Sequence, residues 1–371
     1  MKLLQKNPVC YFLILISFFV FSRCHDTIDA PGISDVDLTH IPYQPVPYLP
    51  EIPSGFPALE QPADNPMTLD GIRLGKKLFY DPILSIDSTI SCSSCHQPSK
   101  SFTDQLPLSP GVGGNTNRSS IGLLNVAFQY HGFFWDGRAS TLELQALQPI
   151  ENVVEMGESW ENVEKKLRRH PGYQTEFRKA FGIESSSMIN RDLATKAISQ
   201  FERTIISGGK TRYDRFARGE IFLNDNETNG YLMFFNVDPV LPDAQCGHCH
   251  TGPLFGSTDY FNNGLQESAD LEGFADKGLG AITGKASDNG KFKTPTLRNL
   301  VFTAPYMHDG RFNTIQQVVE HYTSGGKFSP NKSAFLNNLH LTESQKSDLI
   351  SFILTLTDSS VLTNPAYKNP F

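Results

Sequence analysis

Apolar residues along this chain recur mainly at helical spacing. The first clear stripe runs from Leu193 to Ile205 in steps of four residues, which places its side chains on one face of a helix. Two further stripes follow the same rule: Ile315, Val318, Val319 and Tyr322, and then Leu349, Ile353 and Leu356. Alternating apolar and polar residues, the pattern of strands, form no run of comparable length. The chain is therefore predicted to be mainly α, with little β-structure.

Capping boxes predict where some of these helices begin. Ser140 with Glu143 forms one box, and Pro149 is expected to end the short helix that follows. The other two boxes are Thr314 with Gln317 and Thr342 with Gln345. Between the helices lie long loops rich in glycine and asparagine, such as 107–120 and 256–291. Long loops in a compact protein are often functional, and they suit a core that is filled by a large cofactor.

Residues 1–24 are predicted to be an export signal. Lys2 and Lys6 precede an apolar run over residues 9–21. This run is shorter than the roughly 20 residues that span a bilayer, and it has the length of a signal-peptide core. The run leads to Cys24, in the position where a bacterial lipoprotein signal carries the cysteine that becomes lipidated. A plain signal peptide with an incidental Cys24 is the alternative.

Composition and charge limit the classes of partner that the chain is expected to bind. Residues 25–66 are rich in proline, which favours a stiff, extended backbone, so we expect a tether and an arm lying on the first domain. The net charge of the chain is -7, and it becomes -10 once the three basic residues of 1–24 are removed. This balance argues against nucleic acid and against anionic membrane surfaces. A lipid on Cys24 would be the only link to a membrane.

Four of the six cysteines lie in two CxxCH motifs. The first comprises Cys92, Cys95 and His96, and the second comprises Cys246, Cys249 and His250. In such a motif the two thiols add to the vinyl groups of a porphyrin and the histidine binds the iron. A zinc site would need further cysteine or histidine ligands at matching spacing, and the remaining histidines are scattered. The sequence therefore predicts two covalently bound haem c groups.

The segments around these motifs carry a more specific signal. They are 74–82 (LGKKLFYDP), 134–138 (FWDGR), 154–157 (VEMG), 294–299 (TPTLRN) and 304–310 (APYMHDG). In this order they resemble the bacterial di-haem cytochrome c peroxidase family, which includes the MauG enzymes. The resemblance runs from about Met67 to Asp358.

The resemblance implies a fold of two c-type cytochrome domains packed across an interface. On this basis residues 67–222 form an N-terminal domain whose haem reacts with hydrogen peroxide. Residues 223–358 form a C-terminal domain whose haem receives electrons, and 359–371 are a tail. The implied location is the periplasm. The implied partners are hydrogen peroxide and a small electron donor, either a mono-haem cytochrome c or a cupredoxin, and a homodimer is also expected.

The resemblance also implies roles for three residues. Trp135 corresponds to a tryptophan between the haems, Gln145 to a distal glutamine and Glu155 to a distal glutamate. The chemistry agrees, because cleaving peroxide requires a proton to move between its oxygens and a carboxylate can carry it. Taken singly, Trp135 would be read as a core aromatic and Glu155 as a solvated carboxylate; their shared spacing favours the functional interpretation.

The sequence departs from many family members at the first haem. Those members carry a distal histidine in the loop before the tryptophan motif. Here the loop 109–115 reads SPGVGGN, and the position falls near Gly111. No histidine occurs between His96 and His131, and His131 is interpreted as structural. The first haem is therefore expected to keep one axial position permanently open, as in MauG.

A second departure concerns the sixth ligand of the second haem. The family's methionine position is occupied by Tyr322, as in MauG enzymes, and a tyrosinate would lower the reduction potential. Met307 is the rival ligand, and a core role for Tyr322 is the remaining alternative. The family also binds calcium, for which the carbonyls of Thr303 and Pro305 match two ligands; the third position holds Ser119, a weaker donor than asparagine.

These features predict a cytochrome-c peroxidase, an oxidoreductase that reduces hydrogen peroxide to water. MauG-like oxidation of a partner protein is a variant of this hypothesis. A non-enzymatic electron carrier or haem sensor is the alternative from another class. Gln145 and Glu155 beside an open iron favour an enzyme, because a pure carrier has both axial positions filled.

Overall fold

Two helices form the centre of the N-terminal half of the chain. The computed structural model describes residues 35–130 and 132–371; the predicted signal 1–24, Cys24 and His131 lie outside them. Helices α1 (Leu69–Tyr80) and α6 (Arg191–Glu202) pack against each other, with α3 and α5 beside them. The other helices of this half are α2 (Cys92–Cys95), α3 (Leu142–Glu151), α4 (Trp160–Arg169) and α5 (Pro171–Phe181).

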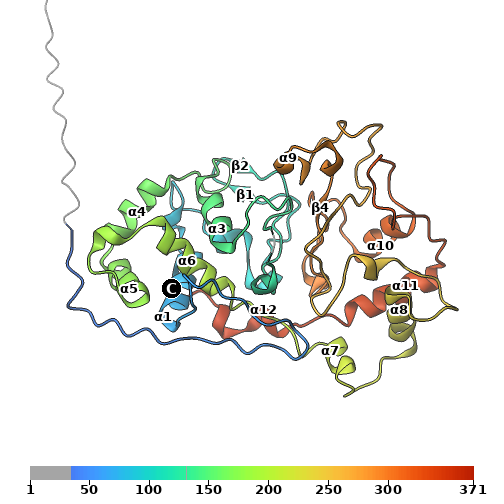
Figure 1. The fold of residues 1–371 in the computed structure, drawn as a ribbon, viewed down its shortest axis with the longest axis horizontal. Helices are drawn as coiled ribbons and strands as arrows, with labels where there is room; N and C mark the ends of the chain where they lie inside the picture. Colours follow the sequence, from blue (N-terminus) through green and yellow to red (C-terminus); the bar gives the residue numbers. More distant parts are fainter. Residues whose placement is uncertain (1–34, 131) are drawn as a thin grey trace, which may run out of the picture. The chain divides into compact units, whose positions relative to one another are not determined.

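The C-terminal half is arranged around a second helix pair, α8 (Asp225–Phe235) and α11 (Glu343–Leu354) (Figure 1). Its remaining helices are α7 (Arg212–Ala217), α9 (Gly280–Thr283) and α10 (Ile315–Thr323), and α12 (Ser360–Thr363) follows them in the chain. The four strands are two residues long and form two antiparallel pairs: β1 (Pro110–Gly111) with β2 (Gly114–Asn115), and β3 (Tyr260–Phe261) with β4 (Phe292–Lys293). The prediction of a mainly α fold with long loops and little β-structure is confirmed.

Each half has its own hydrophobic core, and the chain crosses between the cores. Leu74, Leu78 and Phe177 are fully buried in the N-terminal core. Phe255 and Phe352 are fully buried in the C-terminal core. The last residues return to the N-terminal half, where α12 lies in Figure 1: Val361 and Tyr367 are buried beside Phe79 and Phe102. The segment predicted as a tail is thus part of the packed structure.

The proline-rich segment lies across both halves. Leu38 is buried in the N-terminal core, and its N–H donates to the carbonyl of Glu184 at 2.8 Å. Farther along, the ring of Phe56 packs edge-on against Phe128, with 5.4 Å between the ring centroids. The guanidinium of Arg298, from the C-terminal half, lies 4.9 Å from the centroid of the same ring. The arm therefore contacts more than the first domain on which it was expected to lie.

Helix boundaries show where the sequence patterns were accurate. Both later capping boxes form as predicted, at Thr314 and at Thr342. The first prediction was wrong by one residue, because the N-cap of α3 is Thr141 and its hydroxyl accepts from the N–H of Leu144. Pro149 does not end α3, which continues to Glu151. A proline deletes only one helical N–H donor, and the last turn is closed by the N–H of Asn152 donating to the carbonyl of Gln148 at 3.0 Å.

The same local arrangement of a bridged turn, a cap and a helix, here called the frame, occurs in both halves. A turn closed by an antiparallel bridge, Phe133↔Ala139 in the first half and Tyr306↔Phe312 in the second, encloses an Asp-Gly-Arg sequence. A threonine then caps the next helix, α3 or α10. Matching the two frames pairs Trp135 with His308. It also pairs Pro149 with Tyr322, since each lies eight residues beyond its threonine cap.

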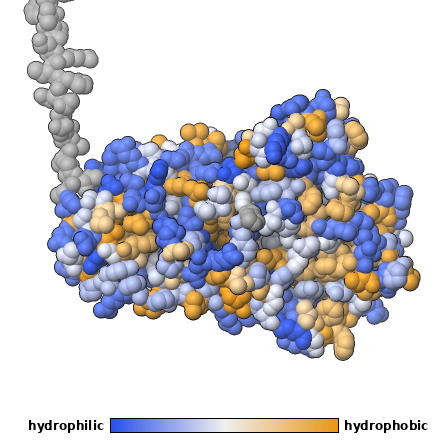
Figure 2. All heavy atoms as spheres, viewed as in Figure 1, coloured by the Kyte–Doolittle hydropathy of each residue, from blue (hydrophilic) through white to orange (hydrophobic). Residues whose placement is uncertain are grey.

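The remaining features of the fold are the polarity of its surface and the length of its helices. Figure 2 shows polar and apolar side chains interspersed over the face that it presents. Within residues 35–130 and 132–371, no helix has both the length and the apolar character needed to cross a membrane.

Candidate active site

A large cavity, lined mainly by the N-terminal half and closed on one side by residues of the C-terminal half, contains the first CxxCH motif. Its volume is about 1040 Å³, at the upper limit of the 300–1,000 Å³ that small-molecule sites usually occupy. Cys92 and Cys95 begin and end the single turn of α2, which Ser91 caps together with Ser94. This turn presents both thiols and His96 to the same cavity.

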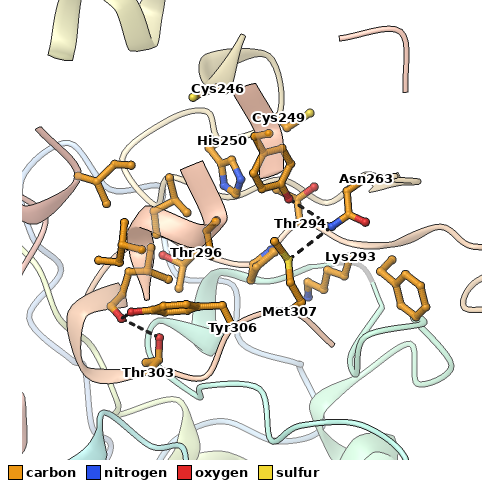
Figure 3. A pocket seen from close by; sticks show the side chains of 18 of the residues that line it. Cys246, Cys249, His250, Asn263, Lys293, Thr294, Thr296, Thr303, Tyr306 and Met307 are labelled. Atoms are coloured by element: carbon orange, nitrogen blue, oxygen red, sulfur yellow. Dashed lines mark hydrogen bonds between the residues drawn. The ribbon is translucent and has the colours of Figure 1, made fainter. Parts of the chain in front are cut away.

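A second cavity, of about 220 Å³, is lined by the second motif. Cys246, Cys249 and His250 lie along one side of it, and Met307 reaches it from another (Figure 3). All four motif cysteines are free thiols, so none is committed to a disulfide.

The two motif histidines are held in the same way. The Nδ1 of His96 lies 3.0 Å from the carbonyl oxygen of Phe102, and the Nδ1 of His250 lies 3.1 Å from that of Phe255. An Nδ1–H that donates to a carbonyl leaves Nε2 as the free lone pair of the ring, as is common for metal-bound histidine. Burial lowers the pKa of both, that of His250 to about 4. Neutral imidazoles and free thiols at a cavity are the donor set that covalent haem requires.

The mature protein is expected to carry two covalently bound haems. Mass spectrometry after expression in a host that matures c-type cytochromes should show two added haem masses. Cys92→Ser should lose the thioether bond of the first haem only, and Cys246→Ser that of the second only. A wild-type mass with one haem or none would contradict the assignment of both motifs.

Gln145 and Glu155 reach the first cavity from neighbouring elements. Gln145 lies on α3, and Glu155 lies in the loop after it; both line the cavity together with His96. The amide of Asn152 donates to Oε1 of Glu155 at 2.9 Å. Burial raises the pKa of Glu155, although the charge of Arg138 and the bond from Asn152 oppose this. A carboxyl with a raised pKa exchanges protons closer to neutral pH.

A glycine hairpin fixes the backbone at Glu155. The N–H of Val112 donates to the carbonyl of Glu155 at 2.9 Å, and that of Gly113 donates to the carbonyl of Val154 at 3.1 Å. A Cβ on Gly111 would lie 2.1 Å from the carbonyl oxygen of Val154. No side chain fits there without a backbone shift, which is a physical reason for glycine at this position.

Trp135 belongs to a wall that the two cavities share. Eight residues line both cavities: Ser119, Ser120, Ile121, Gly122, Gln129, Trp135, Lys293 and His308. The indole N–H of Trp135 donates to the carbonyl of Ser119 at 2.9 Å. The N–H of Ser119 in turn donates to the carbonyl of His308 at 2.8 Å. A hydrogen-bonded path therefore links Trp135 to the segment that lines the second cavity.

Both candidate sixth ligands line the second cavity. The amide nitrogen of Asn263 lies 3.3 Å from the hydroxyl oxygen of Tyr322 and 3.6 Å from the sulfur of Met307. Both candidate ligands therefore lie next to the side-chain amide of Asn263. Burial raises the pKa of Tyr322 to about 12. At the matching position of the other half, Pro149 lines the first cavity and has no side-chain atom able to bind iron.

Two of the three residues expected around calcium use their hydroxyl groups in hydrogen bonds within the protein. Thr303 and Pro305 line the second cavity, and the hydroxyl of Thr303 donates to the carbonyl of Leu300 at 3.1 Å. The hydroxyl of Ser119 donates to the carbonyl of Met307 at 2.9 Å. Across the described residues, no group of three or more histidine, cysteine or acidic side chains forms a metal site.

Three charged groups, of which Glu202 and Lys293 are buried and Arg138 is half-buried, were not predicted from the sequence. Arg138 stacks on Phe134, 3.4 Å from the ring centroid, and its charge acts on Glu155; its place in the FWDGR segment was a signal that went unused. Glu202 lines the first cavity, and burial raises its pKa to about 8. Lys293 lies in the shared wall. No sequence pattern distinguishes Glu202 or Lys293 from surface residues.

A mainly helical chain with two cavities, each lined by a CxxCH motif, defines a di-haem c-type cytochrome. A profile of the family described as di-haem cytochrome c peroxidase matches residues 70–221. The chain is 34% identical over 311 residues to the methylamine utilization protein MauG of Methylorubrum extorquens, covering 83% of this chain and 84% of that protein. It is 35% identical over 312 residues to cytochrome c551 peroxidase of Nitrosomonas europaea, covering 83% and 85%.

A solved structure agrees with these relatives. The crystal structure of a MauG-like protein associated with microbial copper homeostasis superposes with a TM-score of 0.78 at 33% identity, covering 87% of this chain and 99% of that one. The chain belongs to the di-haem cytochrome c peroxidase family, which confirms the resemblance, and it is an oxidoreductase of a family that implies two haem c groups.

Proposed function

We propose that the protein is a peroxidase that reduces hydrogen peroxide to water, with cleavage at the N-terminal haem. The observation that carries the proposal is the grouping of Gln145, Glu155 and His96 around one cavity. A haem with one vacant axial position supplies the redox chemistry for peroxide. A pure electron carrier has no use for a carboxyl and an amide in such a place.

The chain keeps the first axial position open through two features. Loop 107–120 carries no histidine, and Gly111 packs on the backbone of Val154, so no longer side chain fits. Pro149 stands where the other half has Tyr322. Neither feature depends on a side chain that has to change its position. Peroxide therefore has access without any ligand having to leave.

Glu155 and Gln145 then have different roles toward peroxide, one in proton transfer and the other in orientation. Glu155 would take a proton from one peroxide oxygen and return it to the other, which would leave as water. Two electrons from the donor and two protons from solvent would convert the remaining oxygen into a second water. Its bond from Asn152 holds the carboxyl in place during this transfer. Gln145 orients peroxide through a neutral amide, which does not compete for the proton. Trp135, in the shared wall, carries electrons from the second haem to the first.

Electrons are proposed to enter through the second haem, held by His250 and by Tyr322 or Met307. The donor is a small periplasmic redox protein, either a mono-haem cytochrome c or a cupredoxin. MauG-like oxidation of a partner protein is the second candidate. It is favoured by Tyr322 and by the 33% identity to a MauG-like structure. Turnover of peroxide with reduced cytochrome c distinguishes the two, because a protein oxidase should consume this donor slowly.

The resting spin states are expected to differ between the haems. The first should be high-spin, because only His96 binds its iron, and the second low-spin, because both of its axial positions are filled. Electron paramagnetic resonance of the oxidised protein should show one signal of each kind. Two low-spin signals would show that another residue closes the first site and would remove the basis of the proposal.

Export and calcium remain part of the proposal. The protein is placed in the periplasm and is held at a membrane by lipid on Cys24. Wild-type protein should then partition firmly with membranes, since a bacterial lipoprotein carries more than one chain, and Cys24→Ser should not. A wholly soluble wild-type protein would exclude the anchor. Calcium, if bound through carbonyls of Thr303 and Pro305, should be detected by elemental analysis of dialysed protein.

A further inference from the structure

One buried cation in the shared wall has no acidic partner. Lys293 lies on β4, and only 4% of its surface is exposed. Its ammonium donates to the side-chain oxygen of Gln129 and, at 2.9 Å, to the carbonyl of Gly132. Both acceptors are neutral. A buried charge without a counter-ion is strongly unfavourable.

Among the described residues, the surroundings of Lys293 offer hydrogen-bond acceptors but no negative charge. Burial lowers its pKa to about 8, and no described carboxylate lies near enough to oppose that effect. An ammonium has three donors, of which Gln129 and Gly132 use two. The aromatic ring of Phe133 lies 5.5 Å from the ammonium. The ammonium of Lys293 therefore keeps one N–H without an acceptor and a positive charge without a counter-ion, at a wall that both cavities share.

The cofactor implied by the motifs carries what is missing. Haem has two propionate carboxylates, on the side of the ring opposite the two groups that become thioethers. In Figure 3, Cys246 and Cys249 lie at one end of the second cavity, and Lys293 lies away from them, beside Met307. A haem attached at these cysteines would extend from them into the cavity, where Lys293 would be available to one of its carboxylates.

We propose that Lys293 is the counter-ion of a propionate of the haem attached at Cys246 and Cys249. Lys293 is then a positioning residue that acts on this haem through charge. Its positive charge offsets the carboxylate and raises the reduction potential of the second haem, which opposes the lowering expected from Tyr322. This inference depends on haem at the second motif and not on the peroxidase activity.

The test compares the reduction potentials of the two haems in variants of the mature protein. Lys293→Gln should lower the potential of the second haem by more than that of the first, and Lys293→Arg should keep the wild-type values. Lys291→Gln is the matched control, because Lys291 lies two residues away, pairs with Asp288 at 3.0 Å and lines neither cavity. It should leave both potentials unchanged.

A vibrational signature separates a direct contact from a distant charge effect. The propionate bending band of the second haem in resonance Raman spectra should shift in Lys293→Gln and not in Lys291→Gln. If Lys293→Gln does not mature, Gln129→Glu offers the lysine a competing carboxylate and should produce the same two changes. An unchanged band, an unchanged second potential, or a shift confined to the first haem would overturn the proposal.

Discussion

Glu155→Gln is expected to slow peroxide cleavage by about 10²–10⁴, the usual contribution of a positioned general acid–base. Glutamine keeps the size of the side chain and its bond to Asn152, but it cannot accept and return a proton. Both haems and both spin states should therefore survive. Stopped-flow mixing of the oxidised variant with peroxide measures the step directly, before electron delivery contributes.

Glu151→Gln is the matched control for this substitution. Glu151 is the last residue of α3 and is exposed, so its loss removes a carboxylate close in sequence without touching the cavity. Its cleavage rate should equal that of the wild type. Trp135→Phe should also spare cleavage but slow electron transfer between the haems. A wild-type rate in Glu155→Gln would refute the proton shuttle and favour a carrier or sensor.

Arg298→Met is expected to destabilise the protein by about 3–5 kcal/mol, the cost of removing one partner of a buried ion pair. The guanidinium is wholly buried and donates to the two oxygens of Asp214 at 2.7 and 3.1 Å. It also donates to the carbonyl of Pro253 at 2.6 Å. Methionine satisfies none of these acceptors and leaves the carboxylate of Asp214 buried without a counter-ion.

Denaturant unfolding of the mature protein measures this loss, and Lys277→Met is the control. Lys277 forms an exposed pair with Glu272, which should contribute at most about 1 kcal/mol. Burial acts to raise the pKa of Asp214, but the bonds and charge of Arg298 outweigh burial, so the pKa in the folded protein lies below its ordinary value. The stabilisation from Asp214 is therefore present above that pH and is lost as the pH falls. The difference between wild type and Arg298→Met should narrow in acid, and a constant difference would contradict the ion-pair explanation.

Local patterns in the sequence predicted the fold better than they predicted helix ends. The stripes at Leu193 and Leu349 mark real helices because a buried face requires that spacing. The stripes also extend past the helices: Ile205 and Leu356 follow α6 and α11, yet both are buried. A core continues into the turn after a helix, and periodicity alone does not show where the helix stops.

The sequence predicted the site residues that follow one another at characteristic intervals. It did not predict the residues whose only distinguishing property is burial without an ion pair. Gln145 and Glu155 follow Trp135 at intervals that the family resemblance supplies, and the structure places all three at the first cavity. Lys293 and Glu202 are notable only because three-dimensional packing buries them without an ion pair to any described residue. Such a property depends on contacts between distant segments, which no single stretch of sequence records.

The frame shared by Asp136 and Asp309 bears on how such a protein can arise. A duplicated single-haem ancestor would begin with two equivalent sites, and the frame preserves that equivalence in its turn, its cap and its helix. The halves now differ at a few matched positions, with tryptophan against histidine and proline against tyrosine. Specialisation of one haem for substrate and of the other for electrons therefore requires side-chain replacements on a common scaffold rather than a new fold, and each half provides an internal reference for the other.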